Sequence, residues 1–182
     1  SSDVCSSDLF ITPILYHTTL PTTPLIPSIQ TNNTLLEILN KQNKTLFTIA
    51  ETEKYAHVTY FFNGHKDITF DNETRILIPS LPLQPVDHPQ MQAEKITTTV
   101  LNSLQNHPKD FYLINYANAD MVGHSGDLPA TIKAIECLDE QLHQLYEKIV
   151  VQMRGTMYIT ADHGNAECMF DPITRQRCTS HT

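Results

Sequence analysis

The residues best suited to chemistry in this chain are an aspartate and a histidine, Asp162 and His163, which follow a short apolar run. The run predicts a buried strand over residues 156–161, and side chains that directly follow a strand of a parallel sheet lie where such folds bind ligands. A carboxylate oxygen beside an imidazole nitrogen suits zinc or manganese. Gly164 lets the backbone turn after the pair. The pair predicts a metal site, although a polar turn would explain an isolated Asp–His pair equally well.

Two further clusters of polar side chains follow predicted strands. Asp120 and His124 are four residues apart, so one helical turn or a compact loop would bring both side chains to one side. Lys54 lies in an acidic stretch after another strand, and His181 lies in a polar loop. Taken singly, Lys54 could be a solvated lysine and His181 an exposed terminal histidine. The coincidence of three polar clusters after predicted strands, which contain Lys54, Asp120 and Asp162, favours a shared site.

A different set of residues from the same region could form another metal site, for zinc. Zinc prefers sulfur and nitrogen ligands, and the chain offers four such residues within a short span. This alternative is weaker because the cysteines lack the usual short spacing and because the three residues Asp120, His124 and Asp162 are left without a role. Its four residues are His163, Cys168, Cys178 and His181.

The elements that must position these residues alternate between strand and helix. Strands are predicted at residues 45–50, 75–79, 111–116 and 156–161. Helices are predicted from residue 35 to the polar stretch at 41–44 and over residues 51–64, 92–106 and 128–152, whereas the four prolines of residues 81–89 predict a loop. This alternation indicates an α/β fold with a mostly parallel sheet and helices on both of its faces.

The first thirty residues have no such pattern. Residues 1–9 contain the triplet Ser-Ser-Asp twice and are interpreted as a non-native remnant. Residues 10–30 are rich in threonine and proline and predict a linker with one short strand at residues 14–16. The main domain is therefore expected to span residues 31–182.

Composition limits the classes of function. The chain has 182 residues, 40% apolar residues and a net charge of −8, without a cluster of lysine or arginine. This argues against nucleic-acid and anionic-membrane partners. No apolar run is long enough to span a bilayer, and the four cysteines have no framework spacing, so we expect a cytoplasmic protein with reduced thiols.

Five motifs occur in an order that identifies a family. They are ETEKYAHVTYFFNG at residues 51–64, RILIPS at 75–80, NYANADMVGHSG at 115–126, TADHGNAE at 160–167 and SHT at 180–182. From about residue 30 onward the chain resembles the cofactor-independent phosphoglycerate mutases of the alkaline phosphatase superfamily. The resemblance implies an alkaline-phosphatase-like fold, which this chain would contain only in part.

The resemblance also implies a reaction and a ligand set. It implies a site for two Mn²⁺ ions that interconverts 3-phosphoglycerate and 2-phosphoglycerate through a phosphoserine, in a monomeric enzyme of glycolysis. One metal would be held by Asp120, His124 and His181, and the other by Asp162 and His163 together with residues outside this chain. Lys54 would lie near the transferring phosphoryl group. Cations at these places would neutralise the charge of that group.

The chain departs from the family pattern at several points. No segment resembles the family's amino-terminal serine nucleophile region or its arginine-rich substrate domain, so residues 10–30 are interpreted as the tail of that domain. His65 replaces a glycine that the family usually has, and the loop at residues 81–89 diverges. We therefore expect this chain alone to be inactive. Another phosphomutase or phosphatase of the superfamily, or a non-catalytic metal-binding remnant, remains an alternative.

Overall fold

The computed structural model describes residues 10–13, 22–26, 31–171 and 173–181 of the chain. The chain divides into two compact units, Ser1–Asn32 and Asn33–Thr182. In the first unit, strands β1 (Ile11–Thr12) and β2 (Thr23–Pro24) pair in parallel, with Ile11 opposite Thr23. The strand predicted at residues 14–16 lies outside the described residues.

The second unit is built on a parallel sheet of three strands. These are β3 (Leu46–Glu51), β4 (Glu73–Ile78) and β5 (Phe111–Asn115), in the spatial order β4-β3-β5. The register places Leu46 opposite both Glu73 and Phe111. Every residue of β3 is buried because the strand is central, and its mostly apolar sequence predicts this.

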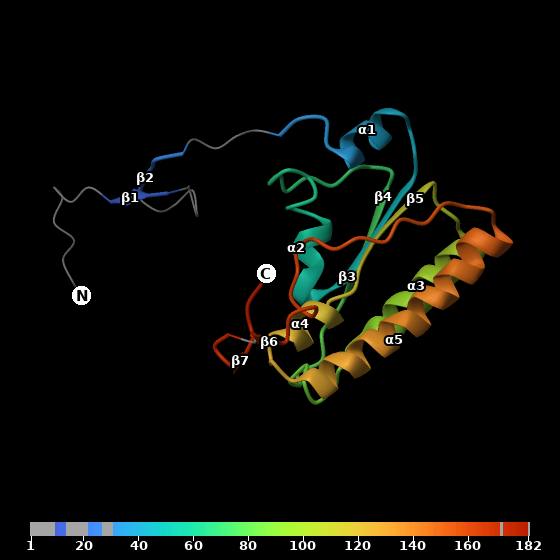
Figure 1. Cartoon of the computed structure of the whole chain (residues 1–182). Helices are drawn as coiled ribbons and strands as arrows, with labels where there is room; N and C mark the ends of the chain where they lie inside the picture. The colour runs from blue at the N-terminus through green and yellow to red at the C-terminus, as the bar shows by residue number, and fades with distance from the viewer. Residues whose placement is uncertain (1–9, 14–21, 27–30, 172, 182) are drawn as a thin grey trace. The chain divides into compact units, whose positions relative to one another are not determined.

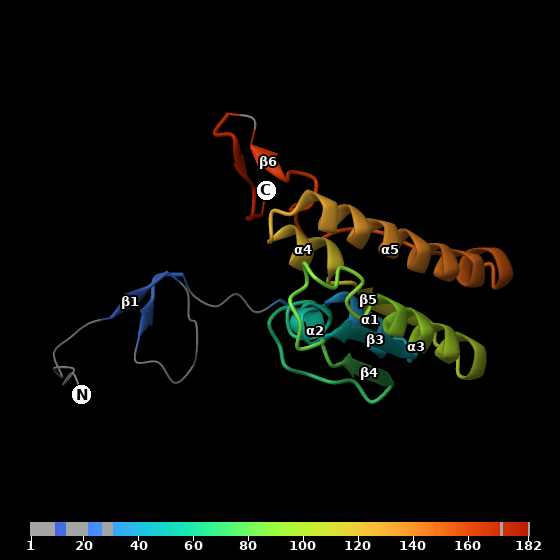
Figure 2. The ribbon, with the colours of Figure 1, turned by 90° about the horizontal axis from the view of Figure 1, so that it is seen from below.

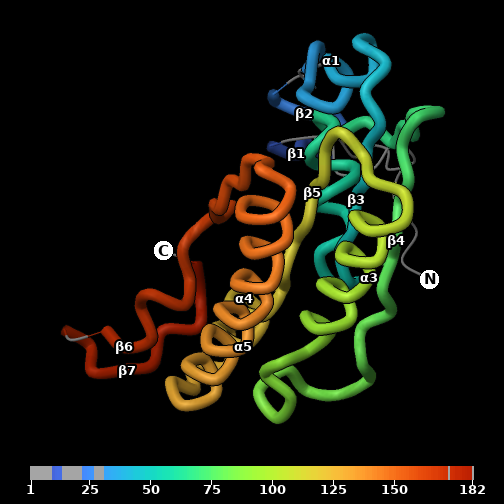
Figure 3. The backbone as a smooth tube through the Cα atoms, turned by 90° about the vertical axis from the view of Figure 1, so that its right-hand side faces the viewer, coloured from blue at the N-terminus to red at the C-terminus, as the bar shows by residue number. Residues whose placement is uncertain are grey.

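Helices cover both faces of this sheet. Helix α1 (Leu35–Lys41) precedes β3, and the short helices η1 (Thr52–Lys54) and α2 (Tyr55–Val58) follow it. Helix α3 (Ala93–Asn106) crosses back from β4 over β3, and α4 (Asn118–Gly123) and α5 (Leu128–Tyr146) follow β5. The connection from β3 to β4 contains α2, and the connection from β4 to β5 contains α3 and runs in the opposite direction across the sheet. Because such connections are right-handed, α2 and α3 lie on opposite faces. Figures 1 to 3 show α3 and α5 side by side on one of them.

The core lies between the sheet and the α3–α5 layer. Ile49 from β3 and Ile96 and Val100 from α3 are completely buried there, and Leu145 of α5 is nearly so. Each side chain of this kind contributes about 1.5–3 kcal/mol when it is removed from water. The core therefore fixes α3 and α5 against the sheet whose strand ends carry the polar clusters.

Most of the predicted elements are confirmed. The observed bounds of β3, β4, β5 and α3 lie within two residues of the predicted bounds at both ends. Helix α1 begins at Leu35, as predicted. Helix α1 begins with a capping box, in which Thr34 and Glu37 exchange hydrogen bonds. The predicted α/β fold with a parallel sheet is likewise confirmed.

The helix predicted over residues 51–64 is wrong in its extent. Only residues 52–58 are helical, in η1 and α2, and turns follow up to residue 64. The β-branched and aromatic side chains from Thr59 onward lose rotamer freedom in a helix. Gly64 and His65 then adopt φ angles of 66° and 64°, a conformation that favours glycine. The position where His65 departs from the family pattern thus has a backbone that suits glycine.

The long helix predicted over residues 128–152 is continuous but changes its hydrogen bonding. Helix α5 begins at Leu128, where the Asp127 side chain accepts a hydrogen bond from the Ala130 N–H, and it continues as the π-helix η2 (Glu147–Gln152). The apolar periodicity that predicted the helix does not distinguish the two hydrogen-bonding patterns.

The strand predicted over residues 156–161 is wrong. These residues pair with no strand among those described, and Tyr158 and Ile159 are 91% and 70% exposed. Met157 alone packs against the core. An apolar run becomes a strand only where a neighbour supplies hydrogen bonds, which no described strand does here. The chain instead forms a hairpin further on, from β6 (Phe170–Asp171) and β7 (Gln176–Arg177), which we did not predict.

No helix in the described part of the chain is both long enough and apolar enough to cross a bilayer.

Candidate metal centre

The centre forms where the carboxyl ends of β3 and β5 meet. Lys54 ends η1 after β3, and Asp120 lies on α4 after β5. The chain runs from β3 to β4 on one side of β3, whereas β5 lies on the other side. In open α/β sheets, ligands bind at the carboxyl ends of neighbouring strands where the strand order reverses in this way. Lys54 Nζ lies 2.6 Å from Asp120 Oδ2, and the two side chains are only 7% and 14% exposed.

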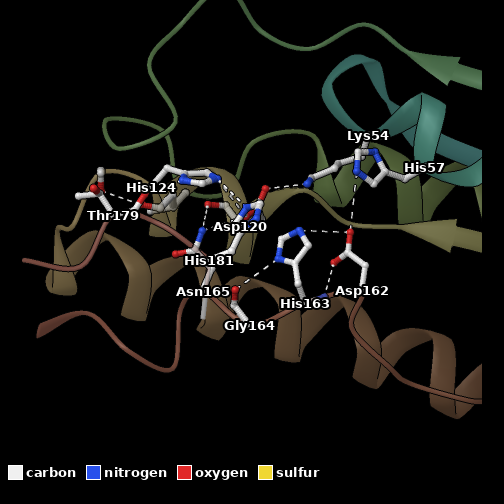
Figure 4. A network of polar contacts seen from close by, with 12 residues as sticks. Lys54, His57, Asp120, His124, Asp162, His163, Gly164, Asn165, Thr179 and His181 are labelled. Carbon is white, nitrogen blue, oxygen red and sulfur yellow. Dashed lines mark hydrogen bonds and ion pairs between the residues drawn. The ribbon is translucent and has the colours of Figure 1, made fainter. Parts of the chain in front are cut away.

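Asp120 also faces two imidazoles. Its Oδ1 lies 3.2 Å from His124 Nε2 and 3.1 Å from His181 Nε2, and these two nitrogens are 3.1 Å apart. Figure 4 shows Asp120 between Lys54 and the two histidines. One oxygen and two nitrogens thus converge on one point, as a first-row divalent metal requires. Within the described residues, no other group of three histidine, cysteine, aspartate or glutamate side chains converges in this way.

Hydrogen bonding prepares His124 for a metal. Its Nδ1 lies 2.7 Å from the Thr179 carbonyl oxygen, which can only accept, so Nδ1 carries the proton and donates it. The lone pair of Nε2 is then directed at Asp120 and His181. A histidine held in this way by a backbone carbonyl is a common arrangement behind metal ligands. These residues therefore fit a divalent metal ion.

Asp120 is held in its charged form. Burial by itself would raise the pKa of this carboxyl, but hydrogen bonds from Lys54 and Asn165, together with the positive charge of Lys54, outweigh burial and lower the pKa to about 2. Asp120 is therefore ionised at neutral pH and can serve as an anionic ligand without releasing a proton.

Asp162 and His163 adjoin this cluster. The His163 ring stacks on that of His181 with 3.7 Å between centroids, and His163 Nε2 lies 3.5 Å from Asp162 Oδ2. His163 Nδ1 lies 3.3 Å from the Gly164 carbonyl, which directs Nε2 toward Asp162 in the manner of His124. All five residues predicted as ligands, and Lys54, are thus brought to one place (Figure 4).

The alternative zinc site from two cysteines and two histidines does not assemble. Cys168 and Cys178 have their sulfurs 3.5 Å apart, but the described residues contain no group of three donors that includes them. His181 instead faces Asp120 and His124. The hairpin β6–β7 brings the two cysteines together away from these imidazoles.

Two polar residues at the centre were missed by the sequence analysis. Asn165 is 4% exposed and donates from Nδ2 to Asp120 Oδ1, at 2.8 Å. His57 of α2 has its Nε2 3.9 Å from Asp162 Oδ2. Burial, followed by the charge of Lys54, lowers the pKa of His57, which favours its neutral form. Both belong to the motifs at residues 51–64 and 160–167, but only the fold reveals their contacts.

The comparisons with known proteins agree with this geometry. The family model described as the metalloenzyme superfamily matches residues 16–182. A protein of Legionella pneumophila (strain Corby) named 2,3-bisphosphoglycerate-independent phosphoglycerate mutase is 45% identical over 174 residues, which make up 95% of this chain and 34% of that protein. A protein of the same name from Francisella philomiragia is also 45% identical, with the same coverage.

A solved structure is similar as well. The phosphoglycerate mutase of Leishmania mexicana, determined at low cobalt concentration, superposes with a TM-score of 0.80 at 34% identity and covers 89% of this chain and 32% of that one. The chain thus spans about a third of the length of the relatives it matches. The resemblance found in the sequence is confirmed by these matches, and the chain belongs to the metalloenzyme superfamily.

Proposed function

We propose that this chain is part of a metal-dependent phosphoglycerate mutase that interconverts 3-phosphoglycerate and 2-phosphoglycerate through a phosphoserine. The observation that carries this proposal is the convergence of Asp120, His124 and His181 beside a buried lysine, in a chain 45% identical to relatives of that name. Its substrates would be small phosphorylated acids. By the family resemblance, the enzyme would act in glycolysis as a cytoplasmic monomer.

The five ligands would divide into two sets. Asp120, His124 and His181 would hold one ion, and Asp162 and His163, with ligands from beyond this chain, would hold a second. We propose Mn²⁺ for both, since mixed oxygen and nitrogen sites accept it. When bound, such cations neutralise phosphoryl charge and favour the ionised form of a coordinated hydroxyl.

Lys54 would contact the phosphoryl group being transferred. Its ammonium is 2.6 Å from Asp120 and has little access to water, so its charge is directed into the centre. A fixed positive charge in a water-poor site stabilises developing negative charge more strongly than the same charge in water. Lys54 would therefore stabilise the transferring group in place.

No serine near the centre is assigned as the nucleophile. The Ser125 hydroxyl donates to the Val122 carbonyl at 2.6 Å and accepts from the Asp127 N–H at 3.1 Å, which ties it into the turn before α5. Ser180 is exposed and matches no nucleophile motif. We propose that the nucleophile lies outside this chain, and that the chain alone binds metal but does not catalyse the interconversion.

Calorimetric titration of this chain with Mn²⁺ tests the metal assignment. Wild-type chain should show saturable binding, and a variant with His124→Ala and His181→Ala should lose it, because two of three ligands are gone. A variant with His107→Ala and His143→Ala, two exposed histidines on or beside helices, is the matched control and should bind normally. Equal binding by both double variants would refute the ligand set.

The activity is tested in the complete protein. Asp162→Ala should abolish Mn²⁺-dependent interconversion of the two phosphoglycerates, measured by enzyme-coupled absorbance. A pentose phosphate offered in parallel tests the reaction class. Normal turnover by the variant would reject the catalytic role of Asp162, and preference for the pentose phosphate would reject the proposed substrate.

A further inference from the structure

Asn165 makes contacts that neither the ligand set nor the proposed reaction requires. Its side chain is 4% exposed and reaches from the loop after Asp162 and His163 to helix α4. There Nδ2 donates to Asp120 twice, to Oδ1 at 2.8 Å and to the backbone carbonyl at 3.2 Å. Figure 4 shows this side chain at Asp120. One amide thus joins the loop of one ligand pair to the helix of another ligand.

These hydrogen bonds fix the orientation of the Asp120 carboxylate. Lys54 holds Oδ2 at 2.6 Å, and Asn165 holds Oδ1, so the carboxylate cannot rotate about its Cβ–Cγ bond without breaking a contact. In this orientation Oδ1 also faces His124 and His181. The amide is neutral, so it orients the oxygen without cancelling the charge that attracts a cation. A lysine at this position would hold the oxygen equally well but would repel the metal.

Gly123 makes the approach of Asn165 possible. A Cβ at position 123 would lie 2.8 Å from Asn165 Oδ1 and 2.9 Å from Asn165 Cγ, closer than nonbonded atoms approach. Gly123 ends α4, and glycine is unfavourable within a helix. The close contact with Asn165 supplies a physical reason for glycine at this position.

Asn165 also anchors the turn that carries the second ligand pair. Its N–H donates to Glu167 Oε2 at 2.7 Å, and its carbonyl accepts from the Cys168 N–H at 3.1 Å. The side chain thus extends from a turn that is itself hydrogen-bonded, two residues after His163. A shift of this turn relative to α4 would break the hydrogen bonds between Asn165 and Asp120, so these bonds restrain Asp162 and His163 relative to Asp120.

We propose that Asn165 is a positioning residue that orients Asp120 as a metal ligand and sets the position of the Asp162–His163 pair relative to it. This inference rests on the proposed metal centre. Residues that hydrogen-bond metal ligands typically change metal affinity by about 10- to 100-fold when they are removed. We expect an effect of that size here, because Asn165 holds the one anionic ligand of the triad.

Co²⁺ titration of this chain, followed by visible absorption, tests the inference. Asn165→Leu keeps the branching of the side chain but removes its donor. It should weaken Co²⁺ binding about 10-fold or more and change the d–d spectrum, which reports ligand geometry. Gly123→Ala should do the same, since it displaces the amide. Asn63→Leu is the matched control, because the Asn63 side chain is also buried and its amide donates to the Ile68 carbonyl instead of to a residue of the centre. It should leave affinity and spectrum unchanged.

The outcomes separate this inference from the metal centre. Failure of the wild-type chain to bind Co²⁺ would refute the centre and the inference together. Normal binding by wild type and by folded Asn165→Leu, with identical spectra, would refute the inference alone. If Asn165→Leu fails to fold by circular dichroism, Gly123→Ala decides. Loss of the fold in both variants would assign Asn165 a structural role and would overturn the proposal.

Discussion

Replacing Asp120 by asparagine in the metal-free chain should lower the free energy of unfolding by about 2 kcal/mol at pH 7. The magnitude follows from the folded-state pKa of this carboxyl, which lies at about 2 instead of its ordinary 3.8. Burial opposes ionisation here, but Lys54 and Asn165 stabilise the carboxylate more. The variant removes the carboxylate partner of the Lys54 ammonium, and this interaction is already contained in the lowered pKa.

The sign of the pH dependence follows from the lowered pKa. A carboxyl whose pKa is lower in the folded state contributes stability above its unfolded pKa, and this stability is lost as the pH falls through the folded value. The contribution of Asp120 should be about 2 kcal/mol at pH 7 and at pH 4, and about 1 kcal/mol at pH 3. The difference between wild type and variant should therefore shrink mainly below pH 4.

Urea unfolding followed by circular dichroism, with a chelator present, measures this difference at the three pH values. Asp67→Asn is the control, since Asp67 is exposed and lies outside the centre. It should follow the wild type at each pH. Equal stability of Asp120→Asn and wild type at pH 7, or a difference that stays constant between pH 4 and pH 3, would refute the electrostatic argument.

Three further predictions concern the fold around the centre. Burial raises the pKa of Glu51, so the stability that this carboxyl contributes is present below its ordinary pKa of 4.5 and is lost as the pH rises. Glu51→Gln can still accept the hydrogen bond from the Ser80 hydroxyl. In urea unfolding, the variant should therefore become more stable relative to wild type as the pH rises. Thr34→Ala removes the capping box of α1 and should cost about 1 kcal/mol by the same measurement. Ile96→Ala leaves a cavity at a fully buried core position and should cost about 2–5 kcal/mol, whereas Ile173→Ala, at a 90% exposed position, should have almost no effect on thermal unfolding.

The sequence determined the strands and helices whose side chains are buried on a regular period. The mostly apolar run of β3 and the periodic apolar faces of α3 and α5 favour burial. Burial of a strand and of helices in this order indicates a parallel sheet between helices. The sequence also pointed to Asp120, His124 and Lys54, because polar side chains directly after buried strands must lie at one edge of the sheet. Local chemistry was sufficient for these predictions.

Only the tertiary structure decided the features that depend on residues distant in sequence. Residues 156–161 are apolar enough for a strand but have no described neighbour to pair with, and no local pattern reveals a missing partner. Asn165 becomes a partner of Asp120 only because its loop packs on α4, where Gly123 leaves room for it. Hydrogen bonds and close contacts between segments 45 residues apart arise from packing, whereas periodicity and capping act within a few residues.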